Sequence, residues 1–258
     1  MSVQNIVSFS GGKDSSALVL KSLEKGLPIH ALHHFDGGWE FPQMQDHLDK
    51  FENYTGIPIL RIKPKENFEY WMLERPVIAR TGPLKGQLRG VGHGWPSWTR
   101  RWCTRQKAVY LDKAVADLSN PVKLIGFAAD EEHRARRGMN KKGRYAKYVA
   151  RYPLMEWGVT ESDALAICKR HGFDWGGLYD IFPRVSCFCC PLQSVGELKK
   201  LRLYFPDLWA RMLKWDSARG KHNKGFLHYR TVHDLECRFS WEDYQLSLLS
   251  LISRRKVA

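Results

Sequence analysis

A short run of small and polar residues near the N-terminus is the part of the chain that points most directly to chemistry. It comprises Ser10, Gly11, Gly12, Lys13, Asp14 and Ser15, between the apolar runs 6–9 and 17–20. This order predicts a strand, a glycine turn and a helix, where backbone N–H groups and the helix dipole favour a phosphate group. Lys13 adds a positive charge, and Ser10 and Ser15 add hydroxyl donors. The spacing differs from the Gly-x-x-x-x-Gly-Lys-Ser/Thr P-loop, and the alternative is a Ser/Gly turn without a ligand.

Two further segments bring acidic residues to predicted strand ends. Asp36 ends a predicted strand and is followed by Gly37, so its carboxylate can bind a ribose hydroxyl or Mg²⁺ while the glycine lets the chain turn beside a ligand. A second segment runs from Gly126 through the acidic trio that begins at Asp130 to Arg134. The trio suits Mg²⁺ or a ribose, and the alternative is a solvated acidic turn.

The cysteines have the types and spacing of a metal site. The chain has six of them, at Cys103, Cys168, Cys187, Cys189, Cys190 and Cys237. Cys103 precedes a predicted helix among arginines, and such surroundings lower the pKa of a thiol, so Cys103 suits a nucleophile or a metal ligand. Cys187 and Cys190 form a C-x-x-C pair followed by proline, which is common at iron–sulfur sites. We expect Cys237, or else Cys189, as a fourth ligand of a 4Fe–4S cluster. The alternatives are zinc and no metal, and Cys168 is expected in the core.

The elements that must position these residues alternate between strands and helices. Strands are predicted at 6–9, 28–35, 57–62 and 122–128, with helices at 17–20, 41–54 and 104–118. Such alternation implies a parallel sheet, in which ligands lie at the carboxyl ends of the strands. Residues 64–100 are rich in glycine and proline, which predicts a long irregular loop. Further helices are predicted at 160–171, 195–204, 206–215 and 241–252.

The charge of the chain favours a phosphate-rich partner. The net charge is +14 and the sequence pI is about 9.6. Basic residues concentrate in the stretch 131–152, where tyrosines lie among them, as suits nucleic acid. The alternative is a solvated basic loop that contacts only a nucleotide. No run approaches the roughly 18 apolar residues of a membrane span, and no secretory signal precedes the first strand. We therefore expect a cytoplasmic protein without a membrane partner.

The three polar segments together resemble a known family. Residues 10–15 resemble the SGGxDS pyrophosphate loop (PP-loop) of enzymes that cleave ATP between its α- and β-phosphates or hold the adenylate product. Residues 36–42 resemble the D-T-G-x-x-F-P segment of the phosphoadenylyl-sulfate (PAPS) reductase and ATP sulfurylase-like family, with Gly37 replacing Thr. Residues 126–134 resemble its G-I-R-x-D/E-E-S-x-x-R segment, with Ala128 replacing Arg. The resemblance implies that these segments bind ATP, adenylyl sulfate (APS) or PAPS, through residues that include Gly126, Asp130 and Arg134.

The cysteine layout resembles the iron–sulfur branch of this family. In APS reductases a Cys-Cys pair before a helix and a distant C-x-x-C hold a 4Fe–4S cluster, and DNA phosphorothioation sulfurtransferases also carry a cysteine cluster. Trp102 takes the place of the first cysteine of that pair here. Thiol-dependent reductases of the family carry a C-terminal E-C-G-x-H segment whose cysteine attacks the sulfonate. Only Glu236 and Cys237 match it here, which keeps Cys237 as a candidate nucleophile.

These observations predict a PP-loop adenine-nucleotide α-hydrolase-like α/β domain over 1–195 and a helical C-terminal part over 196–258. We expect ATP with Mg²⁺ to adenylate a nucleic acid, DNA or tRNA, which then receives sulfur from a donor protein. Lys13, Asp14 and Asp36 are the candidate catalytic residues for that reaction. The alternatives are a reductase of APS or PAPS that uses Cys237 or Cys103 as nucleophile with an electron donor, and a non-catalytic subunit that binds nucleotide or nucleic acid.

Overall fold

The computed structural model describes residues 3–139, 148–220, 225–227 and 230–255. Contacts within the chain divide it into two compact units. We call Met1–Asn67 with Cys103–Cys187 the sheet unit, and Phe68–Trp102 with Phe188–Ala258 the helical unit. Residues 68–102 thus join the C-terminal helices, a grouping that the predicted division at residue 195 did not include.

The sheet unit is built on five parallel strands. Their order is β3 (Ile59–Ile62), β2 (Ala31–Phe35), β1 (Gln4–Ser8), β6 (Pro121–Leu124) and β7 (Val149–Arg151). The predicted parallel α/β sheet is therefore confirmed. The stretch 131–152, predicted as a basic loop, instead contributes helix α5 (Glu132–Met139) and the edge strand β7. With three residues, β7 is too short for its periodicity to reveal a strand.

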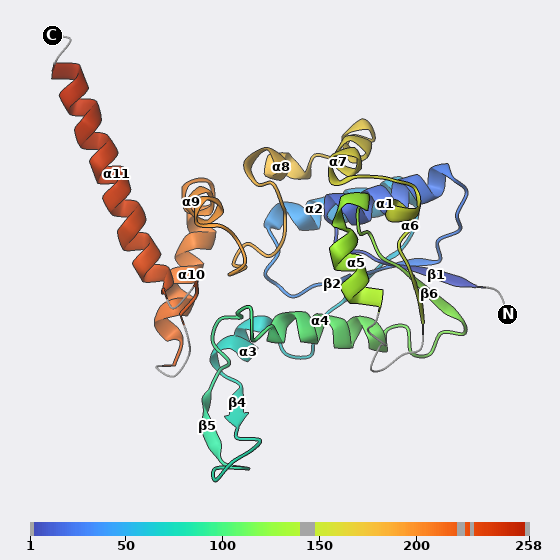
Figure 1. The fold of residues 1–258 in the computed structure, drawn as a ribbon, viewed down its shortest axis with the longest axis horizontal. Coiled ribbons are helices and arrows are strands. Elements are labelled where there is room, and N and C mark those ends of the chain that lie inside the picture. The colour runs from blue at the N-terminus through green and yellow to red at the C-terminus, as the bar shows by residue number, and fades with distance from the viewer. Residues whose placement is uncertain (1–2, 140–147, 221–224, 228–229, 256–258) are drawn as a thin grey trace. The chain divides into compact units, whose positions relative to one another are not determined.

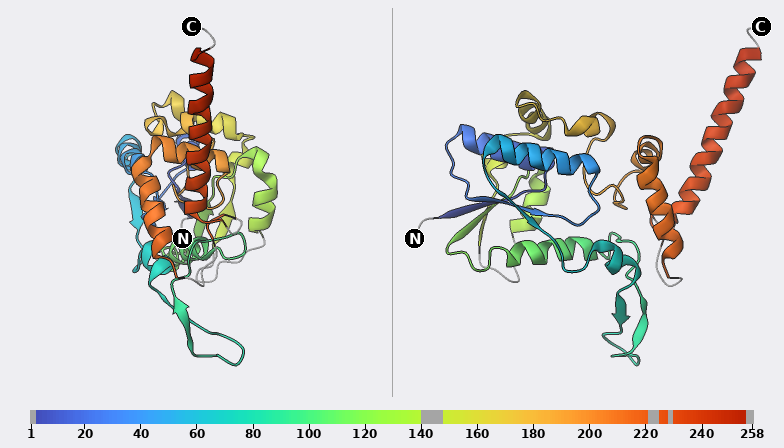
Figure 2. Two further views of the ribbon diagram at one scale, coloured as in Figure 1. Left: turned by 90° about the vertical axis from the view of Figure 1, so that its left-hand side faces the viewer. Right: turned by 180° about the vertical axis from the view of Figure 1, so that it is seen from behind.

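Helices cover both faces of this sheet, as Figures 1 and 2 show, with α1, α2 and α7 on one face and α4 on the other. The bounds are α1 (Lys13–Glu24), α2 (Pro42–Thr55), α4 (Trp102–Lys113), α5 (Glu132–Met139), α6 (Pro153–Glu156), α7 (Glu161–Arg170) and α8 (Leu178–Ile181), with short 3₁₀ turns at Ala129–Glu131 and Trp175–Gly177. Helix α7 begins at a capping box between Thr160 and Asp163, where the helix predicted over 160–171 starts. Helix α4 begins at Trp102, so Cys103 lies within its first turn rather than before it.

The helical unit contains α3 (Phe68–Leu73), α9 (Val195–Tyr204), α10 (Pro206–Ala218) and α11 (Val232–Arg255), together with the antiparallel hairpin β4 (Pro76–Ile78) and β5 (Leu88–Val91). The irregular loop predicted over 64–100 was therefore wrong. Gly92, at φ +71°, brings the chain back against α3, where a Cβ would lie 2.3 Å from the Met72 carbonyl oxygen. The glycines that suggested a loop permit this close contact. No helix among the described residues is long and apolar enough to cross a bilayer.

Three histidines are buried in the sheet unit, on β2 and α2. Burial lowers the pKa of His33 to about 4, with a further contribution from the Lys123 cation. Burial likewise lowers the pKa of His34 to about 4 and that of His47 to about 3. Each imidazole is therefore neutral in the folded protein at neutral pH.

We expect this unit to lose stability on acidification. The folded pKa values lie below the unfolded value of about 6.5, so the unfolded chain binds more protons as the pH falls below 6.5. By linkage each histidine removes about 2 kcal/mol between pH 7.5 and pH 5.0. Urea unfolding at the two pH values measures the loss, and His34→Gln should reduce it, whereas His133→Gln at an exposed site should not. Equal stability at both pH values would contradict the prediction.

Candidate functional site

The glycine-rich segment connects the end of β1 to the start of α1, where the parallel sheet presents its carboxyl edge. Gly11 adopts φ +77°, and a Cβ there would lie 2.5 Å from Met44 Sδ, so this position favours glycine. Gly12 precedes the first turn of α1 and has no side-chain cap. The Oγ atoms of Ser10 and Ser15 lie 3.0 Å apart, and Ser15 Oγ also donates to the Gly12 carbonyl. The loop is thus a tight, hydroxyl-lined turn at a helix N-terminus, the geometry that binds phosphate.

Lys13 is buried between two carboxylates. Its Nζ lies 2.8 Å from Asp14 Oδ1 and 2.6 Å from Glu161 Oε2, at the start of α7. Burial lowers the pKa of Lys13, but the hydrogen bonds and charges of the two carboxylates outweigh burial and raise it overall. Burial raises the pKa of Asp14, while the hydrogen bond from Lys13 lowers the pKa of Glu161. Lys13 is therefore a cation held in place at the loop, ready to neutralise anionic oxygen.

The segment after β6 packs directly against the start of α1. A Cβ on Gly126 would lie 2.9 Å from the Asp14 carbonyl oxygen and 3.1 Å from the Ser15 nitrogen, so the two backbones are in contact. Asp130 Oδ1 accepts a hydrogen bond from the Glu161 backbone N–H at 3.1 Å, which fixes the start of α7. The predicted site residues Gly126 and Asp130 thus shape the loop's surroundings through packing and hydrogen bonding.

Glu131 adds a third carboxylate to this region. Its side chain is buried and paired with Arg134, whose guanidinium lies 4.9 Å from the centre of the Phe127 ring. The Oε2 atom of Glu131 has no hydrogen-bond partner among the described residues. Its charge contributes to raising the pKa of Asp14. Three carboxylates, Asp14, Glu131 and Glu161, thus lie close enough to interact at the start of α1, together with the Lys13 cation.

Asp36 lies at the end of β2, which neighbours β1 in the sheet. Its Oδ1 accepts a hydrogen bond from the Gly38 backbone N–H at 3.0 Å, and its Oδ2 lies 3.6 Å from Lys63 Nζ. Gly37 lies inside this turn. Because β1 and β2 are parallel and adjacent, Asp36 and the loop both lie at the carboxyl edge of the sheet.

Two aromatic residues hold the loop from the segment after α7, and sequence reasoning missed both. Trp175 Nε1 donates to the Gly11 carbonyl at 2.7 Å, and the Tyr179 hydroxyl accepts from the Lys13 backbone N–H at 2.8 Å. Trp175 has φ +54°, a conformation that is rare for a bulky residue and often found at functional sites. More than 160 positions separate each pair. Such distant contacts leave no local pattern, and the Trp-Gly-Gly sequence at 175–177 is the one local sign of an unusual turn there.

We expect Trp175→Phe to loosen the loop while keeping an aromatic ring in place. The Gly11 carbonyl would lose its buried donor, which costs about 1 to 3 kcal/mol. Urea unfolding should show this loss, and isothermal titration should show weaker ATP binding. Trp157→Phe is the matched control in the same unit, because no indole hydrogen bond of Trp157 occurs among the described residues. Equal behaviour of the two variants would contradict the assigned role of Trp175.

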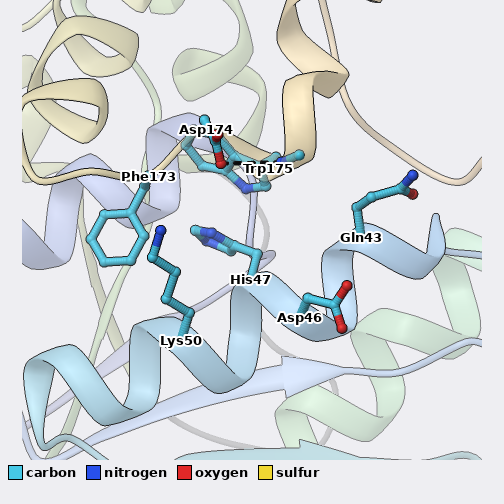
Figure 3. A pocket seen from close by; sticks show the side chains of 8 residues that line it. Gln43, Asp46, His47, Lys50, Phe173, Asp174 and Trp175 are labelled. Atoms are coloured by element: carbon cyan, nitrogen blue, oxygen red, sulfur yellow. Dashed lines mark hydrogen bonds between the residues drawn. The ribbon is translucent and has the colours of Figure 1, made fainter.

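A pocket of about 120 Å³ lies next to Trp175, between α2 and the chain at 173–176 (Figure 3). His47 lines it, stacks on Trp175 with ring centroids 4.6 Å apart, and lies 3.1 Å from Ser16 Oγ. Lys50 donates to the Gly172 carbonyl at its rim. The pocket is smaller than the roughly 300 Å³ that ligand sites usually need. Its residues therefore support Trp175, and through it the loop.

The cysteines predicted as metal ligands are divided between the units. Cys103 and Cys187 belong to the sheet unit, and Cys190 and the exposed Cys237 to the helical unit. Within the described ranges no three His, Cys, Asp or Glu side chains are arranged to hold a metal ion. Burial raises the pKa of Cys103, contrary to the predicted lowering, because desolvation of the thiolate outweighs the Lys107 cation. Cys168 is fully buried, in agreement with its predicted place in the core.

The basic stretch 131–152 is described in part. Lys141, Lys142, Arg144, Tyr145 and Lys147 lie outside the described residues. Arg136 pairs with Glu132, and Arg151 pairs with Glu156 at 2.6 Å. Where this stretch is described, its cations are thus partly neutralised by neighbouring carboxylates.

The parallel sheet with a glycine loop between β1 and α1 defines an α/β protein of the PP-loop class. A family model for the phosphoadenosine phosphosulfate reductase domain matches residues 4–193, and the chain belongs to this family. The loop, the Asp36 turn and the Gly126 segment all lie within the matched region.

Individual proteins extend the comparison. An uncharacterized protein of Methanocaldococcus jannaschii is 28% identical over 233 residues, which cover 85% of this chain and 43% of that protein. The chain thus spans less than half the length of this relative. An uncharacterized 37.8 kDa protein of Escherichia phage 186 is 27% identical over 254 residues, covering 82% of this chain and 74% of that protein. Among solved structures, the U34-tRNA thiolase NcsA from Methanococcus maripaludis with its 4Fe–4S cluster matches with a TM-score of 0.40 and 15% identity, covering 80% and 72% of the two chains.

Proposed function

We propose that this protein is an ATP-dependent adenylating enzyme that activates a nucleic acid, DNA or tRNA, for sulfur transfer. The observation that carries the proposal is the PP-loop itself, with Lys13 Nζ held 2.8 Å from Asp14 and 2.6 Å from Glu161 at the start of α1. Membership in the phosphoadenosine phosphosulfate reductase family supports an adenine nucleotide as the ligand of this loop. The acceptor and the sulfur donor are further parts of the proposal.

The charges around the loop favour MgATP over a metal-free sulfonucleotide. Asp14, Glu131 and Glu161 would repel a bare phosphate or sulfate, whereas Mg²⁺ is commonly bound through one or two carboxylates together with substrate phosphates. A metal ion carried in by ATP would convert this repulsion into attraction. Asp36, at the neighbouring strand end, is the proposed partner of the ribose or of Mg²⁺.

In the proposed reaction an oxygen or nitrogen atom of the acceptor attacks the α-phosphorus of ATP. A bond forms between that atom and phosphorus, the bond to the β-phosphate bridging oxygen breaks, and pyrophosphate leaves. Lys13, the loop N–H groups and the hydroxyls of Ser10 and Ser15 would stabilise the negative charge that develops on the α-phosphate oxygens. Where the adenylated atom is an oxygen, a sulfur nucleophile from the donor then attacks the carbon that bears it. The C–S bond forms, the C–O bond breaks, and the oxygen leaves as part of AMP.

An iron–sulfur cluster, or alternatively zinc, is proposed at Cys103, Cys187, Cys190 and Cys237. A cluster would supply a place to hold or deliver sulfur. The adenylation step above is assigned to the loop residues and does not involve these thiols. A cytoplasmic location, where thiols stay reduced and able to bind a metal, is proposed with this site.

Pyrophosphate release from ATP on addition of tRNA or DNA tests the proposal. We expect release with one of these nucleic acids, and its absence with all of them would contradict the adenylating function. Sulfite formation from APS or PAPS with a thiol donor would instead support the reductase, for which the exposed Cys237 is the candidate nucleophile. Iron and sulfide content after anaerobic purification, compared with Cys237→Ala, tests the cluster separately.

A further inference from the structure

The hairpin of the helical unit is a strongly basic segment. We call residues 75–101 the basic arm. It contains six Lys and Arg residues and no Asp or Glu, and the six are Arg75, Arg80, Lys85, Arg89, Arg100 and Arg101. Over the part of the chain that the structure describes, none of these six cations forms an ion pair with a carboxylate. The arm therefore carries a net charge of +6 that no carboxylate among the described residues neutralises through an ion pair.

The outer part of the arm is an exposed ribbon. Among the described residues, β4 and β5 form a two-stranded sheet of their own (Figures 1 and 2). Arg80, Lys85 and Arg89 are exposed, and so are Ile78 and Leu88, with exposed fractions of 48% and 61%. A lone hairpin is marginally stable in water, and exposed apolar residues at its surface favour contact with a partner.

The base of the arm, in contrast, is firmly fixed to the helices of its unit. Trp95 is buried, and its Nε1 donates to Asp216 Oδ1 on α10 at 2.9 Å. Gly94 N–H donates to the Met72 carbonyl at 2.9 Å, and His93 N–H to the Trp71 carbonyl at 3.0 Å. The arm thus presents its cations from a rigid base.

Aromatic rings accompany the cations of the arm. Trp98 has an exposed fraction of 64%, and the Arg101 guanidinium lies 4.7 Å from its ring centre. Arg75 stacks on Trp71 at 3.7 Å, next to the ring of His93. Burial lowers the pKa of His93, and the surrounding arginines lower it further, so this imidazole does not add charge at neutral pH. Exposed rings beside cations can stack on unpaired bases while the cations contact phosphates.

We propose that the basic arm is a nucleic-acid-binding surface, whose cations contact the phosphodiester backbone and whose Trp98 stacks on an unpaired base. Charge complementarity selects this partner, because a surface of +6 with the exposed ring of Trp98 matches a polyanion that carries bases. The proposal rests on the proposed function, since it gives the site that would hold the nucleic-acid substrate. It moves the expected contact surface from the stretch 131–152 to a segment that the sequence marked as a loop.

The test measures fluorescence anisotropy of labelled tRNA, single-stranded DNA and duplex DNA between 50 and 200 mM salt, without ATP. The variant replaces Arg80, Lys85 and Arg89 by Gln, and the matched control replaces Lys25, Arg170 and Lys214, which are exposed elsewhere, by Gln. Both lose three charges from the same total. We expect the arm variant to bind at least about tenfold more weakly and its salt slope to fall by about 3, while the control stays near wild type. The preferred nucleic acid distinguishes RNA from DNA.

Trp98→Ala should weaken binding of unpaired strands by roughly tenfold and binding of duplex DNA much less, because stacking needs an open base. Equal weakening by arm variant and control, or no nucleic-acid binding by the wild type, would overturn the proposal. Thermal unfolding checks that the variants fold. Pyrophosphate release is measured in parallel. If the arm variant binds nucleic acid more weakly but no protein releases pyrophosphate from ATP, the proposed adenylation is contradicted and the arm proposal stands. If the arm variant binds nucleic acid like wild type and nucleic acid still stimulates its pyrophosphate release, the arm proposal is contradicted and the adenylation stands.

Discussion

Lys13→Met is expected to weaken ATP binding at least about tenfold and to slow pyrophosphate release by roughly 100-fold or more. The lysine is the buried cation that neutralises Asp14 and Glu161, so its removal leaves adjoining carboxylates to repel the phosphates. A 100-fold loss corresponds to about 2.7 kcal/mol of transition-state stabilisation. Isothermal titration with MgATP and a coupled pyrophosphate assay measure the two effects.

The control for Lys13 lies on the same helix. Lys21 pairs with Glu24 in the last turn of α1, and Lys21→Met should leave both measurements near wild type. Lys13→Arg keeps the charge but changes its reach, and should retain part of the binding. Wild-type ATP affinity in Lys13→Met, with an intact fold, would show that the lysine does not contact the nucleotide.

Gly126→Ala should have the second largest effect, on both stability and nucleotide binding. The added Cβ would lie 2.9 Å from the Asp14 carbonyl oxygen and 3.0 Å from its carbon. Both are backbone atoms of the first turn of α1 and cannot swing aside. Relief of this overlap requires α1 to shift, at a cost of about 1 to 3 kcal/mol. A displaced phosphate loop should also lower the rate of pyrophosphate release by up to about 100-fold.

Gly196→Ala provides the matched control for this change. Gly196 lies in α9, where the nearest atom to an added Cβ is Ser194 Oγ at 4.0 Å. Alanine there should be neutral or stabilising by up to about 1 kcal/mol, because it favours the helix. Urea unfolding and ATP titration compare the two variants. If Gly126→Ala behaved like Gly196→Ala, the close contact with α1 would not be essential.

Much of the sheet unit could be predicted from local pattern. The apolar runs before Ser10 and before Asp36 indicated buried parallel strands, and the spacing from Phe41 to Tyr54 indicated α2. The helix predicted over 160–171 corresponds to α7. Strand β7 and the hairpin β4–β5 escaped prediction, because short strands among glycines, prolines and charges carry no clear periodicity.

The cysteines illustrate a different limit. Their spacing predicts a metal site, but the electrostatics of Cys103 depend on burial, which spacing does not contain. Desolvation raises the pKa of this thiol in the structure, although its sequence neighbours Arg100, Arg101 and Arg105 favoured a lowered value. The local sequence thus gave the wrong direction for a property that packing controls.

The sequence by itself determined that residues 10–15 form a turn between a strand and a helix, because glycines and small polar residues separate two apolar runs there. Phosphate binding at this turn is our proposal. Only the tertiary structure decided what surrounds that turn. Lys13 bonds to Glu161, and the Gly11 carbonyl accepts from Trp175. The Asp14 backbone packs on Gly126. More than 100 positions separate the two residues of each pair. Such contacts arise when the sheet aligns its strand ends and the helices pack on it, and no local pattern in the chain records them.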